Sequence, residues 1–176
     1  MRSLTTHGIT KNVSHFQQKS SDPWWYEQHL LGFNYRMSEL HAALGISQLN
    51  KLDKFIFKRK MIADSYNTKL VGSGVDIPRE PGATQSAWHL YIIKCSDAAL
   101  RLKLFLALKD NNIHTTVHYI PVYKQPFFQK IAPHAQDECP MAEDYYDKSL
   151  TLPIHPGMTG NDICTVASLV KKNHAG

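Results

Sequence analysis

Residues 31–53 read LGFNYRMSELHAALGISQLNKLD, and they set the organisation of the whole chain. Ser38 is a good helix N-cap, and Glu39 places a negative charge in the favourable first turn of a helix. From Leu40 onward, apolar residues recur three or four positions apart as far as Leu70. This spacing predicts one long helix over residues 38–70.

Two features of this helix indicate where it changes direction and where it ends. It is longer than an average helix and contains Gly45, so we expect a bend or break between Leu49 and Lys54. Small residues around Gly45 also suit a close contact with another helix. Gly72 and Gly74 end the helical pattern.

The rest of the chain alternates short strands with helices. The predicted elements are strands over 75–78, 88–94 and 113–119, a short extended piece over 151–154, and helices from Ser96 or Asp97 to Asp110, over 141–150 and from Thr159 onward. Apolar faces are expected at Leu100, Leu104, Phe105 and Leu108 in one helix and at Ile163, Val166, Ala167 and Val170 in the last. The predicted class is α+β, with helices covering a mixed sheet of short strands and a long helix leading into it.

The N-terminal segment has a different character. Residues 1–21 are polar, and residues 22–26 read DPWWY, a proline turn followed by three aromatic residues. Exposed aromatic residues at this density favour a surface that is covered by something else. Either this segment packs on a partner chain or another domain, or it forms a small satellite core under a loop.

Composition bounds the class of protein. The chain has 176 residues, of which 43% are hydrophobic and 20% charged, with a formal net charge of +5 and a pI near 9.1. This suits a globular protein with acidic ligands. There is no dense basic run with interleaved aromatics, so we expect no nucleic-acid partner. The polar start and the lack of eighteen consecutive apolar residues predict no signal peptide, no membrane span and a cytoplasmic protein.

The sequence contains few residue patterns that would form a complete catalytic, metal-binding or phosphate-binding site within this chain. The three cysteines are far apart, which predicts reduced thiols. His114 and His118 would lie on one face of a strand but about 13 Å apart, too far to share an ion, so no metal site is predicted. Neither a phosphate-binding glycine loop nor a nucleophile elbow occurs. Asn34 and Arg36 precede a helix and suit a phosphate or carboxylate, or else serve as a turn residue and a surface ion-pair partner.

At this point a resemblance becomes specific. The stretch over residues 31–53 resembles the run G-x-N-Y-R-M-x-E-x-x-A-A-L-G-x-x-Q-L-x-K-L-D of the DegT/DnrJ/EryC1/StrS aminotransferases. Further matching stretches are Arg59, 62–63, Tyr66, WHLY at 88–91, HYIPV at 118–122, QPF at 125–127, AED at 142–144 and SLTLPIHPG at 149–157. Within the family, HGIT at 7–10, HYIPV and LPI at 152–154 are similar to the branch that aminates a UDP-linked 4-keto-6-deoxy-N-acetylhexosamine on the route to pseudaminic acid.

The resemblance implies the C-terminal part of a fold-type I enzyme that depends on pyridoxal 5'-phosphate (PLP) and takes its amino group from glutamate. It implies three regions: a remnant of the large PLP domain and inter-subunit arm over 1–37, a connecting helix over 38–70, and a small α+β domain over 71–176. The full-length enzyme would be an α/β homodimer. The Schiff-base lysine and the aspartate on the pyridine nitrogen belong to the family's large domain, and no lysine in this sequence lies in the family's lysine motif.

The resemblance also implies roles for individual residues. Asn34 matches the residue that reaches the PLP phosphate of the other subunit, and its neutral amide can donate to that phosphate. Arg36 would lie near the same anion or the substrate, or would orient the loop. His118 and Tyr119 match residues that line the sugar-nucleotide site. No catalytic residue is assigned within the chain.

Three hypotheses follow for the 176-residue chain. It is an aminotransferase whose other half lies on another polypeptide or was lost by truncation, a non-catalytic remnant that dimerises or binds sugar nucleotide, or a basic nucleic-acid-binding protein, which the resemblance disfavours. Taken alone, the chain is expected to lack transaminase activity and to associate through surfaces that have lost their cover.

Overall fold

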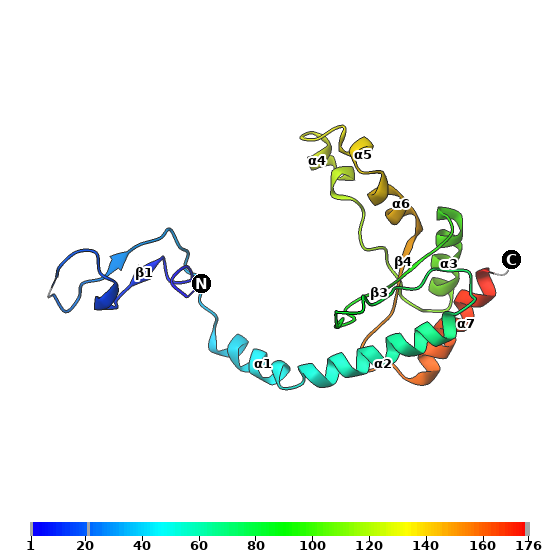
Figure 1. The fold of residues 1–176 in the computed structure, drawn as a ribbon, viewed down its shortest axis with the longest axis horizontal. Coiled ribbons are helices and arrows are strands. Elements are labelled where there is room, and N and C mark those ends of the chain that lie inside the picture. The colour runs from blue at the N-terminus through cyan, green and yellow to red at the C-terminus, as the bar shows by residue number, and fades with distance from the viewer. Residues whose placement is uncertain (1, 21, 175–176) are drawn as a thin grey trace. The chain divides into compact units, whose positions relative to one another are not determined.

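A computed structural model describes residues 2–20 and 22–174 (Figure 1). Met1 and Ser21, the two ends of the polar segment predicted from the sequence, lie outside the described residues. The chain divides into two compact units, residues 1–51 and residues 52–176.

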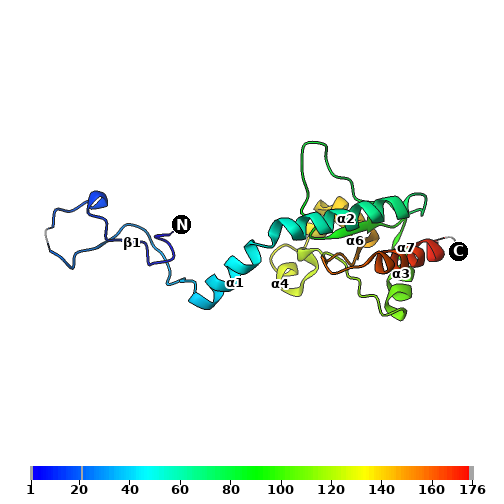
Figure 2. The ribbon, with the colours of Figure 1, turned by 90° about the horizontal axis from the view of Figure 1, so that it is seen from below.

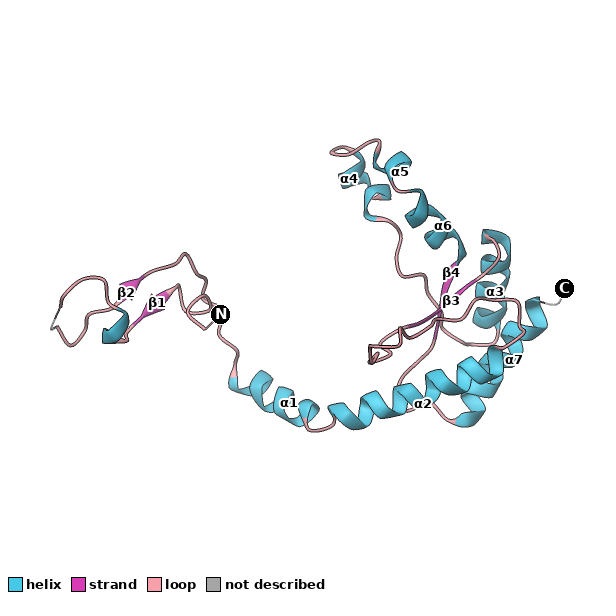
Figure 3. Ribbon diagram, viewed as in Figure 1, coloured by secondary structure: helices cyan, strands magenta, loops and turns pink. Residues whose placement is uncertain are grey.

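The first unit is organised around a small antiparallel ribbon. Strand β1 (Ile9–Thr10) pairs with β2 (Glu27–Gln28), and a short 3-10 helix, η1 (Val13–His15), lies between them (Figure 3). The backbone at Gly8 requires glycine because its φ is +73° and a Cβ there would collide with the carbonyl group of Leu30.

Helix α1 (Glu39–Leu49) ends the first unit. As predicted, Ser38 is its N-cap, and the Ser38 hydroxyl oxygen accepts a hydrogen bond from the backbone N–H of His41 at 3.4 Å. The expected break is confirmed, because α1 stops at Leu49 and α2 (Leu52–Leu70) begins three residues later. The residues predicted as one connecting helix therefore form two helices, and the boundary between the two units falls between them.

The aromatic run of the first unit does not build a satellite core. The Trp24 and Tyr26 side chains are 76% and 54% exposed, Trp25 is half-buried, and no residue of the run is fully buried. The alternative of a small core under the loop is therefore wrong. The interpretation that a partner or another domain covers this segment stays a prediction, as does the division of the chain at residues 37 and 70.

The second unit contains the hydrophobic core. Strands β3 (Tyr91–Lys94) and β4 (Ser149–Leu152) pair antiparallel, with Tyr91 opposite Leu152 and Lys94 opposite Ser149. Helix α7 (Gly160–His174) packs against α2 and against α3 (Ala98–Asp110) (Figure 2). The fully or nearly fully buried core residues are Ile62, Ala63, Tyr66, Leu70, Val75, Trp88, Tyr91, Ile93, Cys95, Leu104, Leu108, Leu150, Leu152, Ile163, Val166, Ala167 and Val170.

Helix signals in this unit were read correctly from the sequence. Asp97 caps α3, and its Oδ1 accepts from the N–H of Leu100 at 2.8 Å. At α7, the Asp162 carboxylate accepts from the N–H and hydroxyl of Thr159 at 2.7 and 2.8 Å, and this capping pair agrees with the helix start predicted at Thr159. The four residues predicted to line the inner face of α7 are all buried, and those predicted for α3 are buried or packed against the core.

Two predicted strands are wrong, and a third is shorter. Residues 75–78 and 113–119 each contribute one isolated bridge, Asp76 to Lys94 and Thr116 to Thr151. Trp88 has a φ of +47°, which is not strand geometry, so β3 starts at Tyr91. All pairings among the described residues are antiparallel, so the sheet is not mixed. The α+β class holds, with helices covering short strands.

A helical segment separates Pro121 from β4. It consists of the 3-10 helix η2 (Val122–Lys124), α4 (Pro126–Gln129), α5 (Ala135–Glu138) and α6 (Pro140–Lys148). Helix α6 was predicted over 141–150, but Ser149 and Leu150 leave the helix to pair in β4. Helix α6 packs on α3, and this contact joins the segment to the core (Figure 1).

Candidate functional site

The segment that carries Asn34 is held by backbone hydrogen bonds to the start of the chain. The N–H of Phe33 donates to the carbonyl of Leu4 at 2.8 Å, and the N–H of Tyr35 donates to that of Thr5 at 3.0 Å. The rings of Phe33 and Tyr35 stack with centroids 5.1 Å apart. Because side chains alternate along an extended segment, Asn34 faces the opposite side from this aromatic pair.

Asn34 and Arg36 are both exposed, and each keeps its hydrogen-bonding capacity. No side-chain hydrogen bond joins Asn34 to any residue in the described ranges, and no ion pair found there includes Arg36. A free amide and a guanidinium two residues apart are suitable donors for an anion. The alternative role of Arg36 as an ion-pair partner within this chain finds no support among these residues.

Glu27 organises the loop of the first unit. Its carboxylate accepts from the N–H groups of Gln17 and Gln18 at 2.7 and 2.8 Å, and His29 Nε2 lies 2.6 Å from Glu27 Oε2. His29, followed by the N–H of Gln17, lowers the pKa of Glu27 from 4.5 to about 2. Sequence reasoning missed this residue, because a lone glutamate carries no pattern that predicts the loop it holds.

The Glu27 contacts predict how this loop responds to acid. The folded-state pKa lies below the ordinary value, so the stabilisation is complete above about pH 4.5 and is lost as the pH falls toward 2. We expect the amide NMR signals of Gln17 and Gln18 to shift in that range. Glu27→Gln should abolish the transition, and Glu39→Gln should leave it in place. Wild-type signals that move only around pH 4.5 would contradict a lowered pKa.

His118 and Tyr119 lie together in the second unit. The rings of His118 and Tyr119 meet edge to face with centroids 4.6 Å apart. His118 Nδ1 is 2.8 Å from the hydroxyl oxygen of Thr151 in β4. This contact leaves the Nε2 atom of His118 for a ligand. Tyr119 is 72% exposed, so its phenol is available. The two predicted pairs thus fall in different units: Asn34 with Arg36 in the first, and His118 with Tyr119 in the second.

Sequence reasoning also missed a cluster next to Tyr119. The Tyr123 hydroxyl donates to Glu143 Oε1 at 2.7 Å, and Lys124 Nζ lies 2.5 Å from Glu143 Oε2. Lys124 also lies over the ring of Tyr146, 4.9 Å from its centroid. The contacts from Lys124 and Tyr123 hold the pKa of Glu143 below its ordinary value, so the carboxylate is charged at neutral pH.

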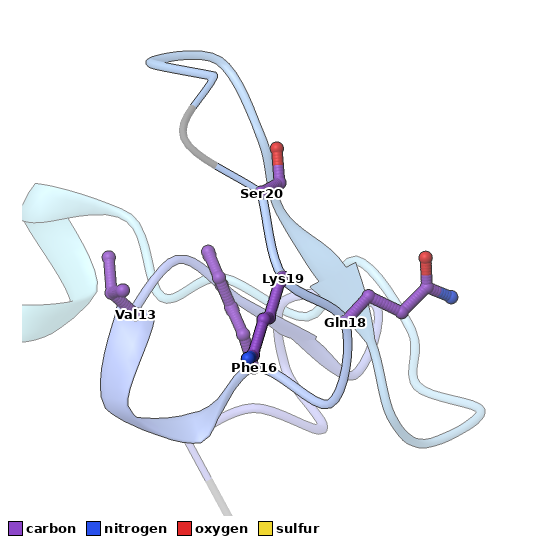
Figure 4. Close-up of a pocket in the computed structure, with 5 residues that line it drawn as sticks. All are labelled: Val13, Phe16, Gln18, Lys19 and Ser20. Carbon is purple, nitrogen blue, oxygen red and sulfur yellow. The ribbon is translucent and has the colours of Figure 1, made fainter.

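Two surface hollows, one in each unit, lie among the described residues away from the predicted site residues. One of about 480 Å³ is lined by Val13, Phe16, Gln18, Lys19 and Ser20, and Figure 4 shows Val13 on η1 and the other four on the loop after it. Another of about 460 Å³ lies in the second unit, with His114, His155 and Asp162 on its wall. Within residues 2–20 and 22–174, no three metal-ligating side chains gather around one point. None of the helices described there combines the length and the hydrophobicity that a membrane span requires.

Solved structures define the class of fold. The chain superimposes on a putative sugar aminotransferase from Streptococcus pneumoniae in its PMP form, with a TM-score of 0.83 and 23% identity, over 99% of this chain and 42% of that one. It also superimposes on Helicobacter pylori PseC, an aminotransferase involved in the biosynthesis of pseudoaminic acid, with a TM-score of 0.81 and 25% identity, over 99% and 45%. The fold is therefore that of part of an aminotransferase, an α+β fragment that corresponds to somewhat less than half of the whole enzyme.

The sequence match is equally extensive. The model of the DegT/DnrJ/EryC1/StrS aminotransferase family matches residues 1–171, and the chain belongs to that family. It is 34% identical to the spore coat polysaccharide biosynthesis protein SpsC of Bacillus subtilis over 97% of its own length. It is 27% identical to the GDP-perosamine synthase of Vibrio cholerae over 84%. The chain spans about half the length of these relatives, 45% of SpsC and 40% of the synthase.

Proposed function

We propose that the chain is the C-terminal portion of a PLP-dependent transaminase that moves an amino group from glutamate to a nucleotide-linked 4-keto-6-deoxy sugar. The family match over residues 1–171 carries this proposal. The resemblance of residues 7–10, 118–122 and 152–154 to the pseudaminic acid branch supports a UDP-linked 4-keto-6-deoxy-N-acetylhexosamine as the substrate, and the likeness to PseC, an aminotransferase involved in the biosynthesis of pseudoaminic acid, agrees with that branch. PLP, when bound, supplies the electron sink for the carbanion chemistry.

The cofactor role of this chain rests on Asn34. Its exposed amide has two N–H donors that no described residue uses, and an amide can bind a phosphate oxygen without adding charge. In the proposed homodimer, Asn34 donates to the PLP phosphate of the partner subunit. Arg36, two residues on, orients the loop or holds an anionic group of the substrate.

The sugar-nucleotide role rests on His118 and Tyr119. Thr151 fixes the orientation of the His118 imidazole, which leaves Nε2 to bind a hydroxyl or diphosphate oxygen. The exposed Tyr119 phenol can both donate and accept a hydrogen bond. The proposed role of this pair is to bind and orient the substrate.

Catalysis requires residues that these 176 do not supply, since none of the lysines lies in the family's lysine motif. The proposal therefore includes a lysine-bearing remainder, on the same or a second polypeptide. The alternative is a non-catalytic remnant that dimerises or binds sugar nucleotide.

Reconstitution separates these two functions. The chain is combined with the lysine- and aspartate-bearing polypeptide from the same genome, and amino transfer from glutamate to a UDP-linked 4-keto sugar is measured. Turnover that falls when Asn34 is replaced by Ala supports the transaminase. A combined sample that binds UDP-sugar but gives no turnover supports the remnant. Transfer to simple keto acids in place of the keto sugar would contradict the proposed substrate.

A further inference from the structure

The segment that carries Tyr119 is anchored on both sides. On one side, His118 contacts Thr151 of β4 at 2.8 Å. On the other, η2 begins at Val122, directly after Pro121, and carries Tyr123 and Lys124. Only residues 119–122 lie between the two anchors. Because so short a connection has few conformations once its ends are fixed, either anchor restricts where the Tyr119 phenol lies.

The second anchor depends on a single carboxylate. Both oxygens of Glu143 are used, one by the hydroxyl of Tyr123 and the other by the ammonium of Lys124. Lys124 and Glu143 are 27% and 21% exposed, so water screens their attraction less than it screens a fully exposed pair. The contact of Lys124 with the Tyr146 ring adds to the same junction between η2 and α6.

Helix α6 is itself held against the core, so the position of Glu143, and of η2 bound to it, is fixed relative to the sheet. Asp144, next to Glu143, pairs with Lys94 of β3 at 2.8 Å and also with Lys148. On its α3 side, Arg101 lies over the Tyr146 ring, 5.7 Å from the centroid. A chain of contacts thus connects the sheet to α6, α6 through Glu143 to η2, and η2 to the segment that carries Tyr119.

We propose that Glu143 is a positioning residue for nucleotide-sugar binding: it holds η2 against α6 and so fixes Tyr119 where the ligand meets it. This inference rests on the proposed function, because it takes Tyr119 as a ligand contact. Glu143 does not touch the ligand. Its effect is to order the Tyr119 segment before the ligand arrives, which reduces the entropy lost on binding.

Two measurements on the full 176-residue chain test this role. The first is hydrogen exchange at the N–H groups of Lys124 and Gln125, which donate to the carbonyls of Pro121 and Val122 at 2.9 and 3.0 Å. The second is calorimetric affinity for UDP-N-acetylglucosamine, with UDP alone as a second probe. Glu143→Ala removes both contacts, whereas Glu143→Gln keeps an acceptor for Tyr123 and loses the charge that holds Lys124.

We expect Glu143→Ala to speed exchange at both amides and to weaken UDP-N-acetylglucosamine binding about tenfold. Glu143→Gln should fall between wild type and Glu143→Ala. The matched control is Glu138→Ala, an exposed carboxylate on α5, which should change affinity by less than about twofold. Unchanged exchange in Glu143→Ala would overturn the anchor, and faster exchange with unchanged affinity would overturn the positioning role.

Failure of the proposed function gives a different result. A wild-type chain that binds neither UDP-N-acetylglucosamine nor UDP contradicts the sugar-nucleotide role of His118 and Tyr119 and overturns the ligand part of this inference. Exchange at Lys124 and Gln125 would still respond to Glu143→Ala in that case. If Glu143→Ala does not fold, Tyr123→Phe and Glu143→Gln each remove one contact and answer the same question.

Discussion

Incubation of the purified chain with PLP, followed by dialysis and only then by borohydride, is expected to leave no cofactor covalently attached to it. The chain has many lysines, but none lies in the family's lysine motif, and a surface lysine binds PLP too weakly to survive washing. For the same reason we expect no amino transfer to a UDP-linked 4-keto sugar. Absorbance after dialysis, intact mass after reduction and product formation provide three independent readouts.

The control for this experiment is the full-length PseC of Helicobacter pylori, treated identically. It is expected to keep PLP through dialysis and gain its mass on reduction. Reduction of the 176-residue chain at one defined lysine, rather than at a mixture of surface lysines, would mean that it builds a cofactor site without the family motif. Measurable turnover by the chain alone would overturn the requirement for a lysine-bearing remainder.

Tyr66→Ala is expected to lower the free energy of unfolding of the second unit by about 3–5 kcal/mol, the usual cost of removing a buried aromatic ring. The Tyr66 side chain is fully buried, its ring lies 4.9 Å from that of Tyr91, and its hydroxyl donates to the carbonyl of Pro153 at 3.0 Å. Burial also raises the pKa of Tyr66, so the phenol stays neutral and keeps donating. Urea unfolding followed by far-ultraviolet circular dichroism measures the change.

Two matched variants separate the parts of this effect. Tyr66→Phe keeps the ring and removes the hydroxyl, so it should cost about 1 kcal/mol for the lost hydrogen bond. Tyr26→Ala removes a mostly exposed tyrosine from the first unit and should change stability by less than about 0.5 kcal/mol. A Tyr66→Ala variant as stable as Tyr66→Phe would show that the ring contributes little to the core.

Features that depend on neighbouring residues were predictable from the sequence. The Ser38 cap, the pairing of Thr159 with Asp162 and the buried face of α7 all follow from spacings of four residues or fewer. The break before α2 was visible in the excess length of the helical pattern. The strands were less predictable. The β-branched run before His118 has a high strand propensity, but whether it forms a strand depends on pairing with β4, and in the structure only Thr116 pairs there, with Thr151.

The candidate site shows the same division. Asn34 and Arg36 stood out by their position before a helix, His118 and Tyr119 were found through the family resemblance, and the roles of all four stay predictions. The contacts around Glu143 were not foreseen, because Tyr123 lies twenty residues away in the sequence and only the packing of η2 on α6 brings them together. The cluster of Glu143 with Tyr123 and Lys124 can be recognised only once the packing of η2 on α6 is known.

The exposure of α1 has a consequence for the thermodynamics of assembly. This helix has eleven residues and buries none of them, and helices of about this length are marginal in water without tertiary contacts. Its apolar side chains, among them Leu40, Leu44, Ile46 and Leu49, remain in water. Whatever surface covers α1 in the assembled protein therefore completes the folding of this helix as it binds. Such coupled folding carries a large negative heat-capacity change, so the enthalpy of association between the parts becomes steeply more negative as the temperature rises.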